Sequence, residues 1–328
     1  MTESGATSWV PVGADSDFPI QNLPWGVFSI KGSPRRVGVA IGDHLLDLTA
    51  LEAAGVLGSH LFQGGTLEPL IALGGASWRQ VRERVAELLD ARTGAQPEVE
   101  QCLVERKDAN LHLPCRIGDF VDFYSSIHHA RNVGRIFRPD SDPLPPNWRH
   151  LPIGYHGRSG TIVVDGTPIR RPQGQREMND YGPTTRLDFE LEVGFLTGPG
   201  RGLGDPVPVA EAESHIFGLV LVNDWSARDI QAWEYQPLGP FLGKSFATTI
   251  SPWVVSADAL EPYRSPPPVQ EPPPLPYLLP AGPGLDLHLE VLVNGEVVSR
   301  SNTRHLYWTM SQQLAHATSN GATFRPGD

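Results

Sequence analysis

The chain of 328 residues is 40% hydrophobic and carries 37 acidic against 26 basic side chains, for a formal net charge of −11. This length and apolar content suffice for one large domain or two ordinary ones with a real core. The negative charge argues against a nucleic-acid partner, because binding phosphates needs a concentrated basic surface. No apolar run is long enough to cross a bilayer and residues 1–10 lack a signal-peptide pattern, so we expect a cytoplasmic protein without a membrane partner.

The first third of the chain has the pattern of a small β-rich domain. The 34 glycines and 32 prolines are scattered between short apolar runs, which indicates many short strands and turns. Strands are predicted at residues 25–29 and 37–48, with a turn at Gly42. A helix is predicted at residues 77–92, because apolar residues recur there at helical spacing behind Ser77, a candidate N-cap.

After residue 116 the predicted strands become longer, so we place an N-terminal domain at residues 1–116 and a second domain at residues 117–328. Strands at 161–164 and 285–293 each run into a turn of the type Asp-Gly or Asn-Gly, which predicts two hairpins.

Two further segments bear on the shape of the second domain. The proline-dense segment 262–283 predicts an extended surface crossover in place of a strand or helix. The last residues, 325–328, form a turn signal that normally delivers the chain into another strand. We therefore expect a second domain that is truncated at its C-terminus.

Residues 188–195 alternate between polar and apolar side chains, so a strand there places Asp188, Glu190 and Glu192 on one face. Glu190 and Glu192 would lie roughly 7 Å apart. Carboxylates this close repel each other, and a hard cation such as Ca²⁺ or Mg²⁺ relieves the repulsion. Alternation alone favours a solvated face of an antiparallel sheet, so a metal site and a wet surface both stay open at this point.

Asp224 and Asp122 are two further candidate ligands. Asp224 follows residues 217–222, which read as a strand buried on both faces. The S-x-x-D pattern from Ser226 to Asp229 predicts that a helix begins there, and an isolated Asp224 would be typical of a turn. Asp122 is followed by His129, whose neutral imidazole can accept a proton near pH 7, although a lone histidine is more often structural.

Basic side chains near these acids can bind an anion. Arg131, Arg135 and Arg138 recur at helical spacing and form either an anion clamp or a solvated basic face. The segment 239–245 falls one residue short of a phosphate-binding loop and precedes a β-segment instead of a helix, which excludes that function. Two interpretations of Lys244 remain: it stabilises negative charge that develops near the metal, or it is an ordinary lysine in a turn.

Taken together, these segments resemble the fumarylacetoacetate hydrolase family. The matching motifs are Asp122-Phe-Tyr-Ser-Ser with His129, Gly154-Tyr-His-Gly-Arg158, Glu190-Leu-Glu192, Asn223-Asp-Trp-Ser-Ala-Arg-Asp229 and Pro240-Phe-Leu-Gly-Lys-Ser245. Residues 16–24 and 38–43 also resemble the family's N-terminal domain, so the resemblance covers the whole chain. It implies a mainly β (α+β) protein, with a small SH3-like N-terminal barrel, a C-terminal mixed β-roll or sandwich, and assembly as a homodimer.

The resemblance also implies an activity, which is hydrolysis of 4-fumarylacetoacetate, an anionic diketone, to fumarate and acetoacetate in tyrosine and phenylalanine breakdown. By motif position, Ca²⁺ would be bound by Asp122, Glu190, Glu192 and Asp224, and Mg²⁺ by Asp224, Lys244 and Thr248. His129 would activate water. The oxyanion would face Arg228, Gln231 and Lys244. The substrate would contact Tyr124, Arg138, Tyr155, Gln231 and Tyr235.

Two features depart from the family pattern. Ala247 stands where the family has glycine, which predicts a slightly altered metal pocket. The family also continues beyond Asp328 with strands that include a glutamate orienting the base, so its lack predicts a poorly positioned His129. The alternatives are a superfamily relative that decarboxylates or hydrates 2-oxo acids, and an inactive, truncated binding or scaffold homologue.

Overall fold

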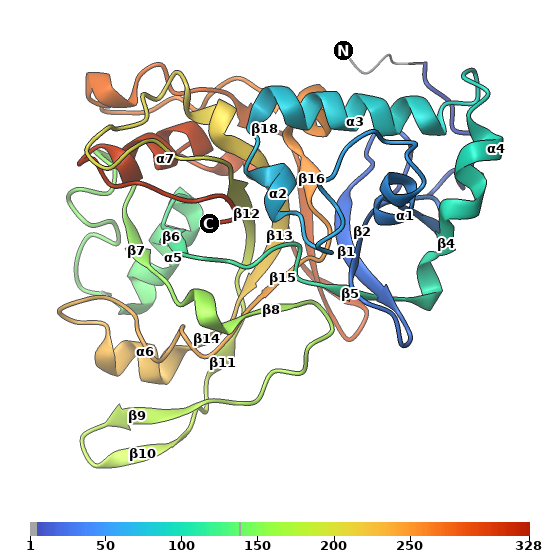
Figure 1. Ribbon diagram of the computed structural model, residues 1–328. Coiled ribbons are helices and arrows are strands. Elements are labelled where there is room, and N and C mark those ends of the chain that lie inside the picture. The colour runs from blue at the N-terminus through green and yellow to red at the C-terminus, as the bar shows by residue number, and fades with distance from the viewer. Residues whose placement is uncertain (1–4, 138) are drawn as a thin grey trace.

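The structure is a computed structural model that describes residues 5–137 and 139–328 (Figure 1). The strands are β1 (Trp25–Ile30), β2 (Arg36–Ile41), β3 (His44–Asp47), β4 (Leu103–Glu105), β5 (Ala109–His112), β6 (Val121–Phe123), β7 (Gly154–His156), β8 (Ile162–Val164), β9 (Gln173–Glu177), β10 (Asp180–Pro183), β11 (Leu187–Asp188), β12 (Leu191–Thr197), β13 (Ile216–Asp224), β14 (Ser226–Ala227), β15 (Thr248–Ile250), β16 (Val255–Ser256), β17 (Arg264–Ser265), β18 (Gly284–Leu285), β19 (His288–Val293) and β20 (Glu296–Asn302). The α-helices are α1 (Leu48–Ala53), α2 (Glu68–Ile71), α3 (Gly75–Leu89), α4 (Gln96–Val99), α5 (Ile127–Phe137), α6 (Arg228–Glu234) and α7 (Met310–Thr318). The predicted mainly β, α+β class is confirmed.

The N-terminal sheet has the antiparallel order β4-β3-β2-β1-β5. The strand predicted at 25–29 is confirmed as β1, and the segment 37–48 forms β2 and β3 around the predicted turn, where Gly42 has φ +54°. The helix predicted at 77–92 is confirmed as α3, but its N-cap is Gly74 and not Ser77. The Ser77 prediction was wrong because the helix begins two residues earlier, which places Ser77 inside the first turn.

A second sheet has the order β12-β13-β15-β8, with β16 paired to β13 beyond β15. The strand predicted at 161–164 is confirmed, but it does not form a hairpin, since β8 runs parallel to β15. The turn does form, with φ +82° at Gly166. Pro168 follows this turn, and a proline cannot donate to a strand ladder, which disfavours a hairpin partner there. The hairpin predicted at Asn294-Gly295 is confirmed by β19 and β20.

The two sheets share one apolar core. Trp25 of β1 exchanges both backbone hydrogen bonds with Val254, at 2.8 and 2.9 Å, between the second sheet's β15 and β16. The indole of Trp78 in α3 packs edge-on against Phe217 of β13, with ring centroids 5.3 Å apart. Figure 1 shows α3 lying along the top of the molecule, above both β1 and β13. The N-terminal region therefore supports the strand that carries Asp224.

Two predictions about the second domain need correction. The strand at 217–222 was predicted to be buried on both faces. This is wrong at Leu221, which is 52% exposed, whereas the other residues of the segment are buried. The segment 262–283 is mostly irregular, as expected, but it also contains the short strand β17 and a 3-10 turn (Pro276–Leu278). None of the helices in the described part of the chain combines the length and the apolar character that crossing a membrane requires.

Candidate metal centre

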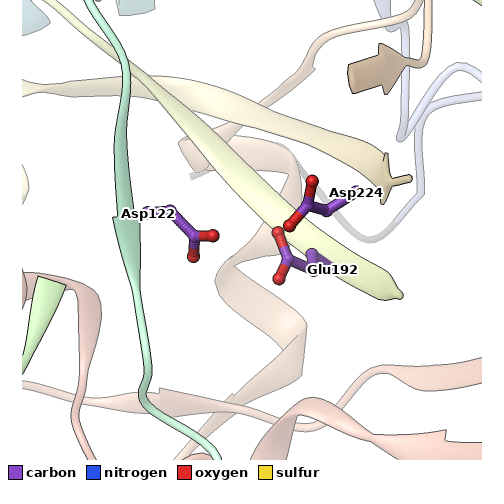
Figure 2. Close-up of side chains that lie close together, drawn as sticks. All are labelled: Asp122, Glu192 and Asp224. Carbon is purple, nitrogen blue, oxygen red and sulfur yellow. The ribbon is translucent and has the colours of Figure 1, made fainter. Parts of the chain in front are cut away.

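Three carboxylates, each half-buried or buried, converge where β6 approaches the β12–β13 pair. Asp122, Glu192 and Asp224 each offer an oxygen, and these oxygens lie within 4.8 Å of one another. Figure 2 shows the three carboxylates pointing toward a common point, Asp122 from β6 and the other two from the β12–β13 pair. The group matches the oxygen-only ligand set that Ca²⁺ and Mg²⁺ prefer.

The strand ladder explains why two of these acids meet. Glu190 and Asp224 exchange both backbone hydrogen bonds, at 3.0 and 3.1 Å, so they face each other across the ladder. Glu192 lies two residues further along and shares their face, because side chains on a strand repeat with a period of two. Asp122 comes from β6, where it pairs with Tyr155 of β7.

The electrostatics of the three carboxylates favour a bound cation. Burial raises the pKa of Asp122, Glu192 and Asp224, and the negative charge of neighbouring carboxylates, Glu190 included, raises each further. The pKa of Asp224 reaches about 7, although the Lys244 ammonium pulls it down. Three neighbouring carboxylates with such pKa values are not all ionised at neutral pH unless positive charge is added. A divalent cation fits this donor set.

Glu190 lies beside these acids in the opposite environment. Its carboxylate lies 2.9 Å from Lys244 Nζ, 2.6 Å from an Arg228 guanidinium nitrogen and 3.5 Å from His129 Nε2. Burial alone would raise the pKa of Glu190, but Lys244, His129 and Arg228 outweigh it and lower the pKa to about 2. Glu190 is therefore ionised, and Lys244, Arg228 and His129 surround it. Its role as a metal ligand stays a prediction.

Helix α6 holds Arg228 and Gln231 in its first turn. The Arg228 guanidinium donates 2.8 Å to Asp188 and 3.1 Å to the Gln231 side-chain oxygen, in addition to its contact with Glu190. The predicted cap from Ser226 to Asp229 was wrong, because the helix begins at Arg228 and the Ser226 hydroxyl donates to the Asp224 carbonyl instead.

The loop that carries Lys244 is tied to the same helix. One carboxylate oxygen of Glu234 accepts from the backbone N–H groups of Phe241 (2.9 Å) and Gly243 (2.7 Å). A Cβ on Gly243 would lie 2.8 Å from Gln231, so only glycine allows this approach. Lys244 is 7% exposed and donates to both Glu190 and Asp224.

Thr248 completes the residues predicted around Asp224. It is buried, opens β15 and lies directly opposite Asp224 in the ladder. Ala247, the position that departs from the family pattern, is buried beside it. The structure thus brings Asp224, Lys244 and Thr248 together, as the second predicted metal set requires.

The remaining predicted residues surround the carboxylates from α5, β7 and α6. His129 meets Tyr124 edge-on, with ring centroids 5.6 Å apart, and burial lowers the pKa of His129 despite the opposing charge of Glu190. Tyr155 hydrogen-bonds Asp122, and burial followed by that negative charge raises the pKa of Tyr155. Tyr235 caps α6 and its ring contacts Phe137 at 5.5 Å. Arg138 lies outside the described residues.

A pocket of about 400 Å³ opens beside the carboxylates. Its lining comprises Phe120, Tyr155, His156, Gly157, Arg158, Asp224, Pro240, Phe241, Lys244, Ser245 and Thr248. Arg158 lies within one of the family-like motifs but carries no pattern that predicts a role, and Glu234 carries no such pattern either. A larger hollow of about 800 Å³ near β18 and α7 contains none of the predicted site residues, so the smaller pocket is the candidate substrate site.

Comparison with known proteins identifies relatives over almost the whole chain. Two family models match, "Fumarylacetoacetase N-terminal" at residues 21–114 and "Fumarylacetoacetate (FAA) hydrolase C-terminal" at residues 120–328. The chain is 51% identical to the fumarylacetoacetases of Rattus norvegicus and Homo sapiens, covering 98% of this chain and 82% of each relative. It is 47% identical to that of Oryza sativa subsp. japonica, covering 100% of this chain and 82% of the relative.

Solved structures share the fold. A fumarylacetoacetate hydrolase from Exiguobacterium antarcticum has a TM-score of 0.57 at 19% identity, covering 93% of this chain and 84% of its own. A maleylpyruvate hydrolase from Sphingobium sp. SYK-6 has a TM-score of 0.55 at 16% identity, covering 93% and 86%. At these identities the likeness shows the fold alone.

Proposed function

The chain belongs to the fumarylacetoacetase family, and from that premise we propose that it hydrolyses the carbon–carbon bond of 4-fumarylacetoacetate to fumarate and acetoacetate. This reaction is the last step of tyrosine and phenylalanine breakdown. The observation that supports it most is the convergence of Asp122, Glu192 and Asp224 beside Lys244, Arg228 and His129, each in a segment that the family motifs cover.

The divalent cation is proposed to be Ca²⁺ or Mg²⁺. Ca²⁺ would be held by Asp122, Glu190, Glu192 and Asp224, and Mg²⁺ would lie at a site lined by Asp224, Lys244 and Thr248. The bound cation would act as a Lewis acid on the diketone oxygens. The raised pKa values of the three clustered acids support this assignment, because bound positive charge is what allows them to ionise together.

His129 is proposed as the base that takes a proton from the attacking water. Its lowered pKa favours the neutral imidazole, which is the form that accepts a proton. Because Nε2 lies 3.5 Å from the Glu190 carboxylate, a proton on Nε2 suits this contact and leaves Nδ1 as the acceptor. Glu190 would thus orient the base from within the described chain.

The negative charge that develops on the substrate needs fixed positive partners. Lys244 stays protonated, since burial lowers its pKa but Glu190, Asp224 and Asp122 outweigh this and raise it. Arg228 and Gln231 are held in place by their mutual hydrogen bond, so we assign all three residues to the oxyanion. The substrate contacts are proposed to come from Tyr124, Arg138, Tyr155, Gln231 and Tyr235.

The division into an N-terminal domain at 1–116 and a catalytic domain at 117–328 stays a proposal, as do the homodimer and the cytoplasmic location. An SH3-like topology is proposed for the sheet β4-β3-β2-β1-β5. The homodimer is supported by the family resemblance.

The proposal is tested by adding 4-fumarylacetoacetate to the purified chain with Ca²⁺ or Mg²⁺ and following the loss of the diketone absorbance. We expect turnover that falls about 10²–10⁴-fold in His129→Ala, the range for a general base. Activity on 2-oxo acids alone would instead favour the decarboxylase or hydratase alternative. Equal turnover in both proteins would overturn the role of His129, and no turnover in either with metal bound would favour the inactive homologue.

A further inference from the structure

The backbone around Arg158 is clamped at the edge of the pocket. Gly157 N–H donates 2.8 Å to the Phe120 carbonyl, and a Cβ on Gly157 would lie 2.2 Å from the Phe120 ring. The Thr161 hydroxyl contacts the Arg158 carbonyl at 3.3 Å and the Ser245 carbonyl at 2.7 Å. These contacts fix the start of the Arg158 side chain between β6 and the loop that carries Lys244.

The Arg158 guanidinium lies over the Phe241 ring, 5.8 Å from its centroid, and lines the same pocket as Lys244 and Thr248. Within residues 5–137 and 139–328, no carboxylate forms an ion pair with Arg158, whereas the Lys244 ammonium is already shared by Glu190 and Asp224. A guanidinium stacked on an aromatic ring keeps its edge free for two parallel hydrogen bonds. The pocket therefore presents one cation whose charge is available to a ligand.

The chemistry of the proposed substrate supplies a matching anion. Hydrolysis to fumarate and acetoacetate means that the diketone carries a carboxylate at each end. Among the proposed substrate contacts, Arg138 and Tyr155 suit the fumaryl carboxylate, and the carboxylate of the acetoacetyl end has no partner so far. A carboxylate that enters an acidic site without a cationic partner is repelled by the ionised groups there.

We propose that Arg158, stacked on Phe241, binds the carboxylate of the acetoacetyl end of the substrate. This inference rests on the proposed function and deepens it, because it makes Arg158 a residue that selects dicarboxylic diketones over monocarboxylic ones. A bidentate contact from guanidinium to carboxylate is the geometry that arginine provides and lysine does not.

Binding of acetoacetate, measured by titration calorimetry on the metal-loaded chain, tests the site without any turnover. We expect Arg158→Gln to weaken acetoacetate binding about 10-fold or more, the typical worth of a charged hydrogen-bond pair, and Arg158→Lys to restore only part of it. Arg300→Gln is the matched control, because Arg300 is an exposed arginine on β20 paired with Glu290. Equal affinity in wild type and Arg158→Gln, or no acetoacetate binding by the wild type, would overturn the proposal.

Kinetics supply a second test that a purely structural role would not pass. With 4-fumarylacetoacetate, we expect Arg158→Gln to lose about 10-fold in kcat/KM, mainly through KM. With the substrate methylated at the acetoacetyl carboxylate, the ratio between wild type and variant should shrink toward 1. An equal loss on both substrates contradicts the proposal. A wild type that hydrolyses neither substrate would refute the proposed function, and the acetoacetate titration would still decide the role of Arg158.

Discussion

Two groups of charged side chains lie side by side in this protein and differ in their net charge. Asp122, Glu192 and Asp224 form a cluster with too much negative charge, and their pKa values are raised. Glu190, on the same strand face, is surrounded by Lys244, Arg228 and His129, and its pKa falls to about 2. The comparison shows that the neighbours of a carboxylate, more than its place in a motif, decide the direction in which its pKa shifts.

The sharpest test of this difference is the pair Glu190→Gln and Glu192→Gln in metal-free protein. We expect Glu190→Gln to lower the free energy of unfolding by about 3 kcal/mol, because it removes one of the two carboxylates that neutralise Lys244 and one of the two that neutralise Arg228. Glu192→Gln should raise the metal-free stability, since it removes one repelling acid. Urea unfolding measures both, with the exposed Glu290→Gln as a control expected to change stability by about 1 kcal/mol or less. If both substitutions changed the free energy of unfolding in the same direction, the difference between the two groups of charges would be contradicted.

Metal binding provides the next largest effect. With Ca²⁺ or Mg²⁺ at about 100 times its dissociation constant, the wild type should gain about 2.7 kcal/mol in unfolding free energy. Glu192→Gln and Asp224→Asn should lose most of this gain, and a thermal melt with and without chelator measures it. A full metal response in either variant would place the cation elsewhere.

The pH dependence of stability should have opposite signs for the two sets. The folded pKa of Asp224 is raised to about 7, so in metal-free protein its protonated form stabilises the fold, and this contribution is lost as pH rises from about 4 to 7. The folded pKa of Glu190 is lowered to about 2, so its contribution is present above about 4.5 and is lost as pH falls toward 2. Comparing unfolding profiles of Asp224→Asn and Glu190→Gln with wild type separates these slopes, and matching profiles would contradict the assignment.

The smallest expected effect concerns the loop that presents Lys244. Glu234→Ala removes the acceptor for Phe241 and Gly243, which should cost about 1–3 kcal/mol of stability. Glu234→Gln keeps one side-chain oxygen as an acceptor and should retain most of it. Activity should fall a few-fold in Glu234→Ala through kcat, because Lys244 would be less well placed. An unchanged kcat with normal folding would show that the loop holds its shape without Glu234.

Much of the site followed from local sequence patterns. The alternation at 188–195 placed Glu190 and Glu192 on one face, because the period of a strand depends on neighbouring residues alone. The partners of Glu190 could not be predicted from the residues themselves, since Lys244 lies 54 positions away in the chain. Asp122 joins Glu192 and Asp224, and not Glu190, because of the position at which β6 approaches the β12–β13 pair. This position is set by tertiary contacts.

The local errors share a cause. Ser77 and Ser226 both matched capping patterns, but tertiary packing fixed the helix starts at Gly75 and Arg228. The Asp165-Gly166 turn formed as predicted, but the strand before it found a parallel partner in β15, distant in the sequence. Capping and turn patterns indicate which local structures a segment can form. Long-range strand pairing decides which of these structures it adopts.

Strand β13 connects the N-terminal region with the metal centre. At its start, Phe217 contacts Trp25 and Trp78 of the N-terminal region, and nine residues of extended chain, about 30 Å, end at Asp224. A strand is stiff along its length, so a cavity-creating substitution of Trp78 and a substitution of Asp224 both disturb β13. Inherited or engineered changes in the N-terminal region should therefore act as remote modulators of cation affinity, and the chain should unfold in a single cooperative transition.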